Sequence, residues 1–274
     1  LKEALGLTRK KLYKEHYALH DVNFDIYEGE CVGIIGTNGS GKSTILKIIN
    51  GLVKPDAGEI ILGSRVHIGY YDQDHQVLHM EKTLFEEISD AYPGMSNTQI
   101  RSTLAAFLFT GDDVFKRIGD LSGGERGRVS LAKLMLSEAN FLILDEPTVG
   151  LDPEERIHFR NLFSRTAQDR LVLLSTHIIE DVQSVCDRLV VIDHGQILFT
   201  GTPEQLIQAA EGHVGVFWER EAGQEQGLHI TARVNTSQGV RCRAVADALP
   251  AYVQRSEPSL EDAYLYLISR EAVQ

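Results

Sequence analysis

The chain has 274 residues, of which 43% are hydrophobic and 24% charged, and its formal net charge is −12 at neutral pH. This length and composition allow one large α/β domain with a substantial core and a small second unit, but no more than two domains. The acidic balance argues against sequence-independent binding of nucleic acid, which needs clustered Lys and Arg, so no nucleic-acid partner is expected.

Cysteine usage and hydropathy indicate the cellular compartment and whether the chain inserts into a membrane. Cys31, Cys186 and Cys242 are far apart in the sequence and match no metal-ligand or redox spacing. We interpret them as packing residues of a protein from a reducing, cytosolic compartment. No apolar run approaches the roughly 18 residues of a membrane span. Direct membrane insertion is therefore not expected, and any membrane role would come through a partner.

The first 30 residues lead into a buried strand. Residues 1–17 are basic, show little periodicity, and are predicted to be an exposed arm. Between Ala18 and Glu30 the apolar residues Val22, Phe24 and Ile26 alternate, which predicts a half-buried antiparallel strand. The apolar run at 31–35 then predicts a short buried strand.

A glycine-rich stretch follows this strand. Gly36 and Gly41 are separated by four residues and followed by Lys42 and Ser43, which is the P-loop pattern for a nucleotide phosphate. Backbone N–H groups would cradle the phosphate, Lys42 would add a positive charge, and Ser43 would bind Mg²⁺. The predicted binding residues are Gly36, Thr37, Asn38, Gly39, Ser40, Gly41, Lys42, Ser43 and Thr44. The alternative is a glycine-rich turn without a ligand, but a strand before it and a helix after it argue against that.

Further along, turn and strand signals give way to helical periodicity. A turn at 55–58 and two strands within 59–71 make the first part β-rich, and Gln73 directly follows the second strand, where its amide could reach a metal bound at the P-loop. Residues from about 83 to 135 have a helical period and predict an inserted helical subdomain. Within it, Ser122 and Glu125 have the spacing of a capping box, which indicates a second helix N-terminus suited to an anion or simply a capped helix.

Two carboxylates follow the next buried strand. The apolar run 141–144 ends in Asp145 and Glu146, and acids at the end of a buried strand are costly unless they hold a metal or transfer a proton. Another apolar run at 171–174 precedes His177. From about Glu211 the pattern changes to separate alternating strands and a terminal helix at 258–268, without a catalytic cluster.

These patterns predict an α/β fold of the P-loop NTPase class. We expect a mostly parallel sheet, an antiparallel β subdomain, the inserted helical subdomain at about 83–135, and a small C-terminal α+β appendix. The predicted division is a nucleotide-binding domain at 1–210 and an accessory domain at 211–274.

Six ordered motifs make residues 18–208 resemble an ATP-binding-cassette (ABC) ATPase. They are the P-loop, Gln73, the Leu-Ser-Gly-Gly-Glu run at 121–125, the strand 141–146, the Gly-Leu-Asp run at 150–152, and His177. The resemblance implies ATP and Mg²⁺ as cofactors. It makes Ser122, Gly123, Gly124 and Glu125 the family signature, Gln73 the Q-loop residue, Asp152 the D-loop acid and His177 the switch histidine. Tyr13 or Tyr17 could stack on adenine, or either could be a rim aromatic.

Different segments resemble different branches of this family. Residues 1–62 resemble the ATPases of polysaccharide and teichoic-acid exporters, and residues 66–147 resemble a cassette of the soluble ABC-F translation factors. Residues from Thr148 onward resemble drug and peptide-antibiotic export ATPases. This pattern indicates a recombined or designed sequence, which would leave the nucleotide chemistry intact.

The resemblance implies an ATP-hydrolysing subunit of an export transporter. It would act as a homodimer or with a paired ABC subunit, on transmembrane permease subunits, in the cytoplasm at the inner face of the cell membrane. Ser43, Gln73 and Asp145 would hold Mg²⁺, Glu146 would act as base, and His177 would contact the γ-phosphate.

Two alternatives stay open. A soluble ABC-F-like factor on the ribosome would need two cassettes, whereas this chain has one P-loop. The second alternative is an artificial nucleotide-binding domain without a coupled partner.

Overall fold

The main sheet has six strands in the order β2-β3-β4-β1-β5-β6. The computed structural model describes residues 18–72, 78–220 and 225–271. The strands of this sheet are β1 (Cys31–Ile35), β2 (Ile68–Tyr71), β3 (Phe141–Asp145), β4 (Leu171–Thr176), β5 (Arg188–Asp193) and β6 (Gln196–Gly201). All neighbours are parallel except β5 and β6. The predicted mostly parallel sheet is confirmed.

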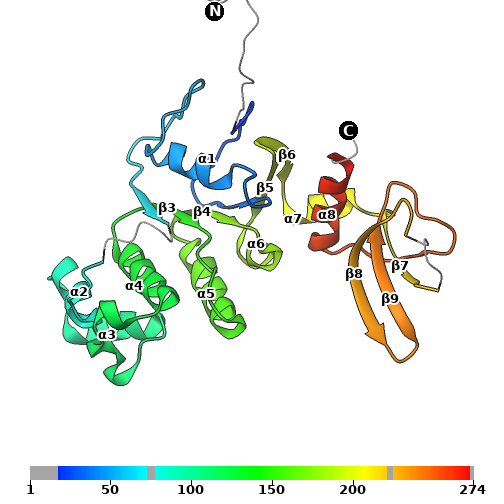
Figure 1. The fold of residues 1–274 in the computed structure, drawn as a ribbon. Coiled ribbons are helices and arrows are strands. Elements are labelled where there is room, and N and C mark those ends of the chain that lie inside the picture. Colours follow the sequence, from blue (N-terminus) through cyan, green and yellow to red (C-terminus); the bar gives the residue numbers. More distant parts are fainter. Residues whose placement is uncertain (1–17, 73–77, 221–224, 272–274) are drawn as a thin grey trace, which may run out of the picture.

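The central strands are buried on both faces. Every residue of β1 and β3 is buried, as expected for continuous apolar runs in a parallel sheet. Val32 and Ile34 of β1 pack into one cluster with helix α1 (Lys42–Ile49), whereas Cys31 and Ile35 pack into the cluster on the other face. Helices therefore cover both sides of the sheet (Figure 1).

The second face is covered by α4 (Gly123–Leu136), α5 (Pro153–Thr166) and α6 (Ile179–Val185). Their apolar side chains join one core cluster with the sheet. Cys186 lies at the end of α6, and its Sγ is 3.7 Å from the Sγ of Cys31 in β1. All three cysteines are free thiols and buried, which agrees with the packing role predicted for them.

The predicted helical insertion lies between β2 and β3. It contains α2 (Leu84–Ala91), α3 (Asn97–Ala106), two short 3₁₀ helices, η1 (Gly111–Phe115) and η2 (Ile118–Asp120), and α4. Helices α2, α3 and α4 each begin with a capping box, so their first N–H groups are satisfied locally. These helices gather at one end of the molecule (Figure 1).

A second, antiparallel sheet follows helix α7 (Pro203–Ala209). Its order is β10-β7-β9-β8, and its strands are β7 (Val214–Trp218), β8 (His229–Thr236), β9 (Gly239–Val245) and β10 (Gln254–Arg255). Helix α8 (Leu260–Glu271) contacts α7, β8 and β9. In Figure 1 this unit lies at the opposite end from the helical insertion.

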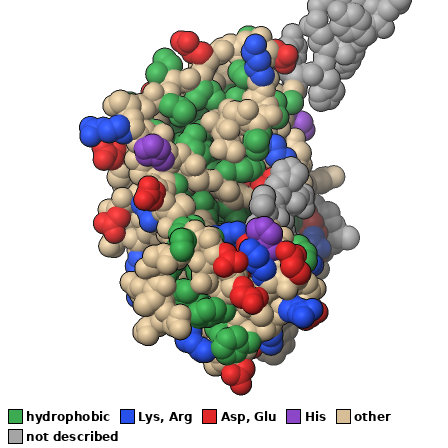
Figure 2. Space-filling view, turned by 90° about the vertical axis from the view of Figure 1, so that its left-hand side faces the viewer, with side chains coloured by type: hydrophobic (Ala, Val, Ile, Leu, Met, Phe, Trp, Pro, Cys, Tyr) green, Lys and Arg blue, Asp and Glu red, His purple; other side chains and the backbone are tan. Residues whose placement is uncertain are grey.

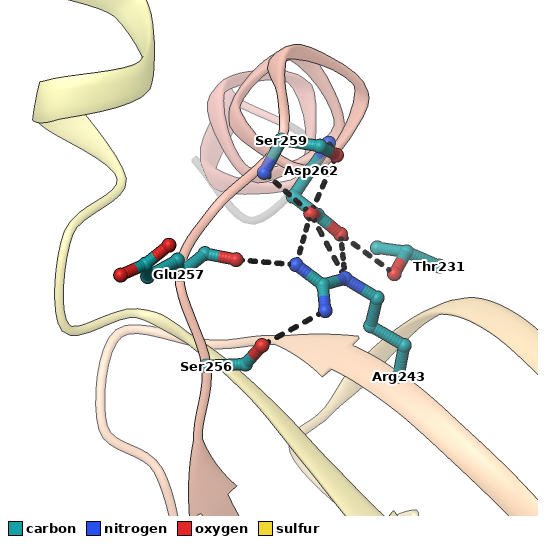
Figure 3. A network of polar contacts seen from close by, with 6 residues as sticks. All are labelled: Thr231, Arg243, Ser256, Glu257, Ser259 and Asp262. Carbon is teal, nitrogen blue, oxygen red and sulfur yellow. Dashed lines mark hydrogen bonds and ion pairs between the residues drawn. The ribbon is translucent and has the colours of Figure 1, made fainter.

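A polar network ties α8 to this second sheet (Figure 3). Arg243 of β9 donates to both carboxylate oxygens of Asp262 at 2.7–2.9 Å, and Thr231 and Ser259 also donate to that carboxylate. The remaining guanidinium nitrogen of Arg243 donates to Ser256. Both carboxylate oxygens of Asp262 and all three guanidinium nitrogens of Arg243 therefore have partners.

Two expected strands are not formed. Residues 18–30 and 59–62 contain no strand, and the antiparallel pairing of the described residues lies in β5 with β6, in the C-terminal sheet and in a single bridge between Thr83 and Arg117. The alternation did predict burial, because Val22, Phe24 and Ile26 pack against the core. Periodicity identifies the side that faces the core, but a ladder also needs a neighbouring strand in register.

The unpaired segment leaves hydrophobic side chains exposed. Ile60, Ile61 and Leu62 are 41%, 83% and 48% exposed, and they belong to the segment between α1 and β2 at the upper left of Figure 1. Figure 2 looks from that side and shows hydrophobic side chains gathered over the upper part of the face.

The sheet order brings three strand ends together. β4 lies between β1 and β3, with Ile35 level with Thr176 and Asp145 level with Ser175. Because parallel strands end at the same edge, the loops after β1, β3 and β4 meet there. These loops carry the P-loop, the two acids and His177.

Candidate functional site

The loop after β1 is shaped by close backbone approach. Gly41 is the N-cap of α1 and has φ of 107°, in the left-handed region that favours glycine. A Cβ on Gly41 would lie 2.6 Å from Cδ2 of Leu19. The loop conformation therefore needs glycine here for two independent reasons.

A buried hydroxyl inside this loop has no partner. Ser40 is 2% exposed, and its Oγ makes no hydrogen bond with any residue in the described part of the chain. A Cβ on Gly36 would lie 2.4 Å from that Oγ, so the loop closes tightly around it. Buried hydroxyls are normally paired, and an unpaired one beside the N–H groups that open α1 fits an anionic ligand such as phosphate.

Lys42 lies across the same loop. It is 5% exposed, and its Nζ donates to the carbonyl oxygens of Gly36 at 2.6 Å and Thr37 at 3.3 Å. The Nζ also lies 3.5 Å from Oε1 of Glu146. The remaining predicted loop residues are exposed at Asn38 and Gly39 and half-buried at Ser43 and Thr44.

The two predicted acids differ in their surroundings. Asp145, the last residue of β3, is 6% exposed and accepts from the Ser175 hydroxyl at 2.7 Å. Glu146 has a backbone φ of 49°, which is uncommon for a residue with a Cβ. This turn directs its carboxylate toward Lys42 and His177.

His177 completes the group at the sheet edge. Its Nδ1 lies 2.9 Å from Oε2 of Glu146, and because a carboxylate only accepts, Nδ1 carries the hydrogen. The His177 side chain is 46% exposed, whereas that of Glu146 is 19% exposed. The Glu146 carboxylate therefore contacts both the Lys42 ammonium of the P-loop and the His177 imidazole of the loop after β4.

The Ser122 to Glu125 run forms a capped helix start. Ser122 is the N-cap of α4, its Oγ accepts from Glu125 N at 3.2 Å, and Glu125 Oε2 accepts from Ser122 N at 2.8 Å. That backbone bond from Ser122 lowers the pKa of Glu125 below its usual value. Gly123 and Gly124 line a small hollow together with Val149 and other loop residues. No hydrogen bond or ion pair among the described residues joins this run to the P-loop.

Asp152 has a local structural role as well. It is exposed, and its side chain accepts from Glu155 N at 2.9 Å as the N-cap of α5. Glu155 in turn pairs with Arg128 of α4. The predicted signature and D-loop regions are therefore linked within one chain.

Three predicted site residues cannot be placed. Gln73, Tyr13 and Tyr17 lie outside the described residues. Within the described part of the chain, no group of three or more His, Cys, Asp or Glu could hold a metal ion. Of the residues predicted to bind Mg²⁺, the described part of the chain contains Ser43 and Asp145, whose hydroxyl and carboxylate are oxygen ligands of the kind that Mg²⁺ prefers.

Sequence reasoning missed a buried group beside the site. Asp181 of α6 contacts Thr148, which lies two residues after Glu146, and Arg160 of α5. In the sequence Asp181 is only the second of two adjacent acids, after Glu180, and nothing in its spacing indicated these partners.

A glycine loop, two strand-end acids and a histidine at adjacent ends of a parallel sheet define a P-loop NTPase. A family model described as ABC transporter matches residues 19–149. The Nod factor export ATP-binding protein I of Rhizobium sp. (strain N33) is 32% identical, with 96% of this chain and 86% of that protein covered. The chain therefore belongs to the ATP-binding proteins of the ABC transporter family. It is an ATPase that binds ATP with Mg²⁺, as the sequence predicts.

Two further similarities cover smaller parts of this chain. The ATP-binding protein YdiF of Bacillus subtilis (strain 168) is 44% identical over 179 residues, but these cover 59% of this chain and only 28% of YdiF. The dimeric post-hydrolysis structure of the ATP-binding cassette MJ0796 bound to ADP and Pi has a TM-score of 0.59 and 27% identity, covering 70% of this chain and 94% of that one. The predicted fold is thus confirmed. No helix in the described residues is long and apolar enough to cross a membrane.

Proposed function

We propose that this chain is the ATP-hydrolysing subunit of an export transporter and works as a dimer on membrane permease subunits. The observation that carries the proposal is the meeting of Lys42, Glu146 and His177 at adjacent strand ends. Export is supported by the names of relatives such as the Nod factor export proteins, and the dimer by the dimeric MJ0796 structures.

The P-loop would hold the substrate. The amides of residues 36–44 and the Lys42 ammonium would bind the β- and γ-phosphates of ATP, with the Ser40 hydroxyl as a further donor. Ser43, Asp145 and Gln73 would hold Mg²⁺, whose charge screens the phosphate oxygens. Tyr13 and Tyr17 remain candidates for stacking on adenine.

Glu146 would act as the base. It lies beside Lys42, so its carboxylate would lie close to the terminal phosphate of a bound ATP and would accept a proton from the attacking water. His177 holds one carboxylate oxygen now and would stabilise charge on the γ-phosphate during transfer. The water oxygen bonds to phosphorus as the bond to the bridging oxygen breaks.

Each dimer site would be shared. Ser122, Gly123, Gly124 and Glu125 make no hydrogen bond to their own P-loop in the described structure, and Asp152 is exposed. These residues would therefore contact the ATP of the second subunit. This arrangement gives one chain two half-sites.

Glu146→Gln tests the base and the dimer together. The variant keeps size and hydrogen bonding but loses the proton-accepting charge, so hydrolysis should stop while ATP binding survives. Bound ATP would then hold two subunits together, and the dimer fraction should rise with ATP concentration. Size-exclusion chromatography with light scattering in Mg²⁺ and ATP measures this.

The matched control is Glu154→Gln on α5, an acid outside the site, which should hydrolyse ATP normally. A Glu146→Gln protein that stays monomeric at tens of micromolar contradicts the shared site. Turnover at the wild-type rate contradicts the choice of base.

The partner and location need a separate experiment. We propose a cytoplasmic chain, peripheral on the inner face of the membrane and bound to permease subunits. Pull-down from solubilised membranes should recover such subunits, whereas co-sedimentation with ribosomes would favour an ABC-F-like factor instead. Recovery of neither would favour a nucleotide-binding domain without a coupled partner.

The origin and division of the chain are also proposals. Uneven similarity supports a recombined sequence, because one relative is 44% identical over 179 residues while others are 31–34% identical over almost the whole chain. If so, separate comparison of residues 1–62, 66–147 and 148–274 should favour different relatives; one uniform best relative would contradict it. The separate C-terminal sheet supports domains at 1–210 and 211–274.

A further inference from the structure

Asp181 is a buried carboxylate next to the proposed site. It is 1% exposed and lies in the first turn of α6, four residues after His177. Its Oδ1 accepts from Arg160 Nε at 2.6 Å, and its Oδ2 accepts from the Thr148 hydroxyl. Two different elements therefore meet at one carboxylate.

Both partners belong to segments that shape the site. Thr148 is fully buried and lies in the loop that runs from Glu146 to Asp152. In that loop Val149 N donates to Glu146 O at 3.2 Å, and Leu151 N donates to Thr148 O at 3.3 Å. A bond that fixes Thr148 therefore restrains the backbone of Glu146 on one side and the start of α5 on the other.

The start of α6 lacks the usual local support. Its N-cap is Ile178, which makes no side-chain capping bond, whereas α2, α3, α4, α5 and α7 all begin with a capping box. Among the described residues, Ile178 N donates to Thr176 Oγ1 at 3.0 Å. Asp181 therefore supplies the side-chain bonds that hold this helix start, and with it His177, against α5 and the loop after β3.

We propose that Asp181 is a positioning residue for ATP hydrolysis, which sets the Glu146 loop and the His177 loop at their working separation. The proposal rests on the proposed roles of Glu146 and His177. Asp181 touches neither side chain, so it acts through Thr148 and through the first turn of α6. Its charge is balanced by Arg160, whose side chain is 18% exposed.

A purely structural ion pair is the competing explanation, and the chain contains a matched control for it. Asp262 is 2% exposed and is also held by an arginine and hydroxyl groups. No hydrogen bond among the described residues joins it to the segment 145–181. Asp262→Asn should therefore lower the melting temperature without changing turnover of the folded protein.

The experiment compares Asp181→Asn with Asp262→Asn in the full chain. Asp181→Asn should lower kcat at least about tenfold with the KM for ATP within about threefold of wild type, because the P-loop contacts are untouched. In a His177→Ala background, adding Asp181→Asn should lower kcat by less than about threefold further, since residues that act as a unit are not additive.

A finer pair of variants covers the case in which Asp181→Asn does not fold. Thr148→Val removes one hydroxyl at constant shape and should lower kcat, whereas Thr148→Ser keeps the hydroxyl and should remain near wild type. Equal kcat for valine and serine variants overturns the proposal, as does kcat loss that tracks melting temperature equally in the Asp181 and Asp262 variants.

The same variants distinguish a wrong proposed function from a wrong inference about Asp181. If Glu146→Gln and His177→Ala keep wild-type turnover, the roles of the site residues are wrong. If Glu146→Gln stops hydrolysis and His177→Ala lowers it to a measurable residual rate, while Asp181→Asn and Thr148→Val leave it unchanged, only the inference about Asp181 is wrong.

Discussion

Two pairs of a cation and a carboxylate, each with one buried and one half-buried member, lie at different places in this molecule and are built differently. At the sheet edge, Lys42 Nζ is 3.5 Å from Glu146, and the nearby Ser40 hydroxyl has no partner in the described structure. In the C-terminal unit, Arg243 binds Asp262 with three short bonds, and serine and threonine hydroxyls complete the network (Figure 3).

This difference distinguishes polar groups that stabilise the fold from polar groups that are available to bind a ligand. A network in which every group is paired adds to the free energy of unfolding, whereas unpaired buried groups cost stability until a ligand supplies the partner. We therefore interpret the Arg243 network as a contribution to folding, and the region around Ser40, Lys42 and Glu146 as the proposed nucleotide site.

The largest expected effect is the loss of activity on Lys42→Ala. Removal of the cation leaves the phosphate charges to the loop amides, so kcat/KM should fall at least about 1,000-fold, or about 4 kcal/mol. Melting temperature should change little, because the lysine makes only loop contacts. Lys47→Ala, on the same helix, is the control and should keep activity. Activity of Lys42→Ala within threefold of wild type would falsify the P-loop assignment.

In contrast to Lys42→Ala, the substitution Asp262→Asn should lower stability and leave activity unchanged. It leaves the half-buried Arg243 guanidinium without its counter-ion, which should lower the free energy of unfolding by about 2 kcal/mol. Denaturant unfolding measures this, and ATP turnover of the folded protein should be unchanged. Asp247→Asn is the matched control, because that side chain is 74% exposed and its partner Arg270 is also exposed. Equal destabilisation by both variants would remove the contrast between the regions.

Acid should weaken the Arg243 network selectively. Burial acts to raise the pKa of Asp262, but hydrogen bonds from Arg243 and Ser259 outweigh it and hold the pKa below its ordinary value. A lowered folded-state pKa means that this stabilisation is complete above the unfolded value of about 3.9 and is lost as the pH falls through the folded pKa. The stability difference between wild type and Asp262→Asn should therefore be constant from pH 7 to 5 and shrink below pH 4. A difference that grows with acidification would contradict this sign.

Deletion of residues 211–274 should have only a small effect on activity. The site residues all precede this segment, so ATPase activity should stay within about threefold. Melting temperature should fall, because α8 buries Leu260 and Tyr264 in the same core cluster as α7 and the main sheet. An insoluble truncated chain would show that this unit is part of the core, and the boundary near 210 would be wrong.

Much of the site was predictable because its signals are local. The glycine spacing, the acids directly after the β3 run and the capping pair at Ser122 and Glu125 each fall within a few residues of one another. The sheet was predictable because apolar strands alternate with helices, and the carboxyl ends of such strands share an edge.

Long-range pairing was not predictable in the same way. The contact between Asp181 and Thr148 joins residues 33 positions apart, and neither residue type signals the other. The strands expected in 18–30 and 59–62 did not form, because alternation gives the buried side but does not supply a partner strand. The positions of Gln73, Tyr13 and Tyr17 stay predictions.

At position 146, the residue that would give the most stable backbone turn differs from the residue that the proposed hydrolysis needs. A glutamate at φ of 49° is held in a conformation that asparagine adopts more readily, so Glu146→Asn should relax the turn while removing the proposed base. A library screened only for thermal resistance would therefore enrich inactive proteins at this position. Improvement of this enzyme by selection needs a turnover assay alongside the stability screen.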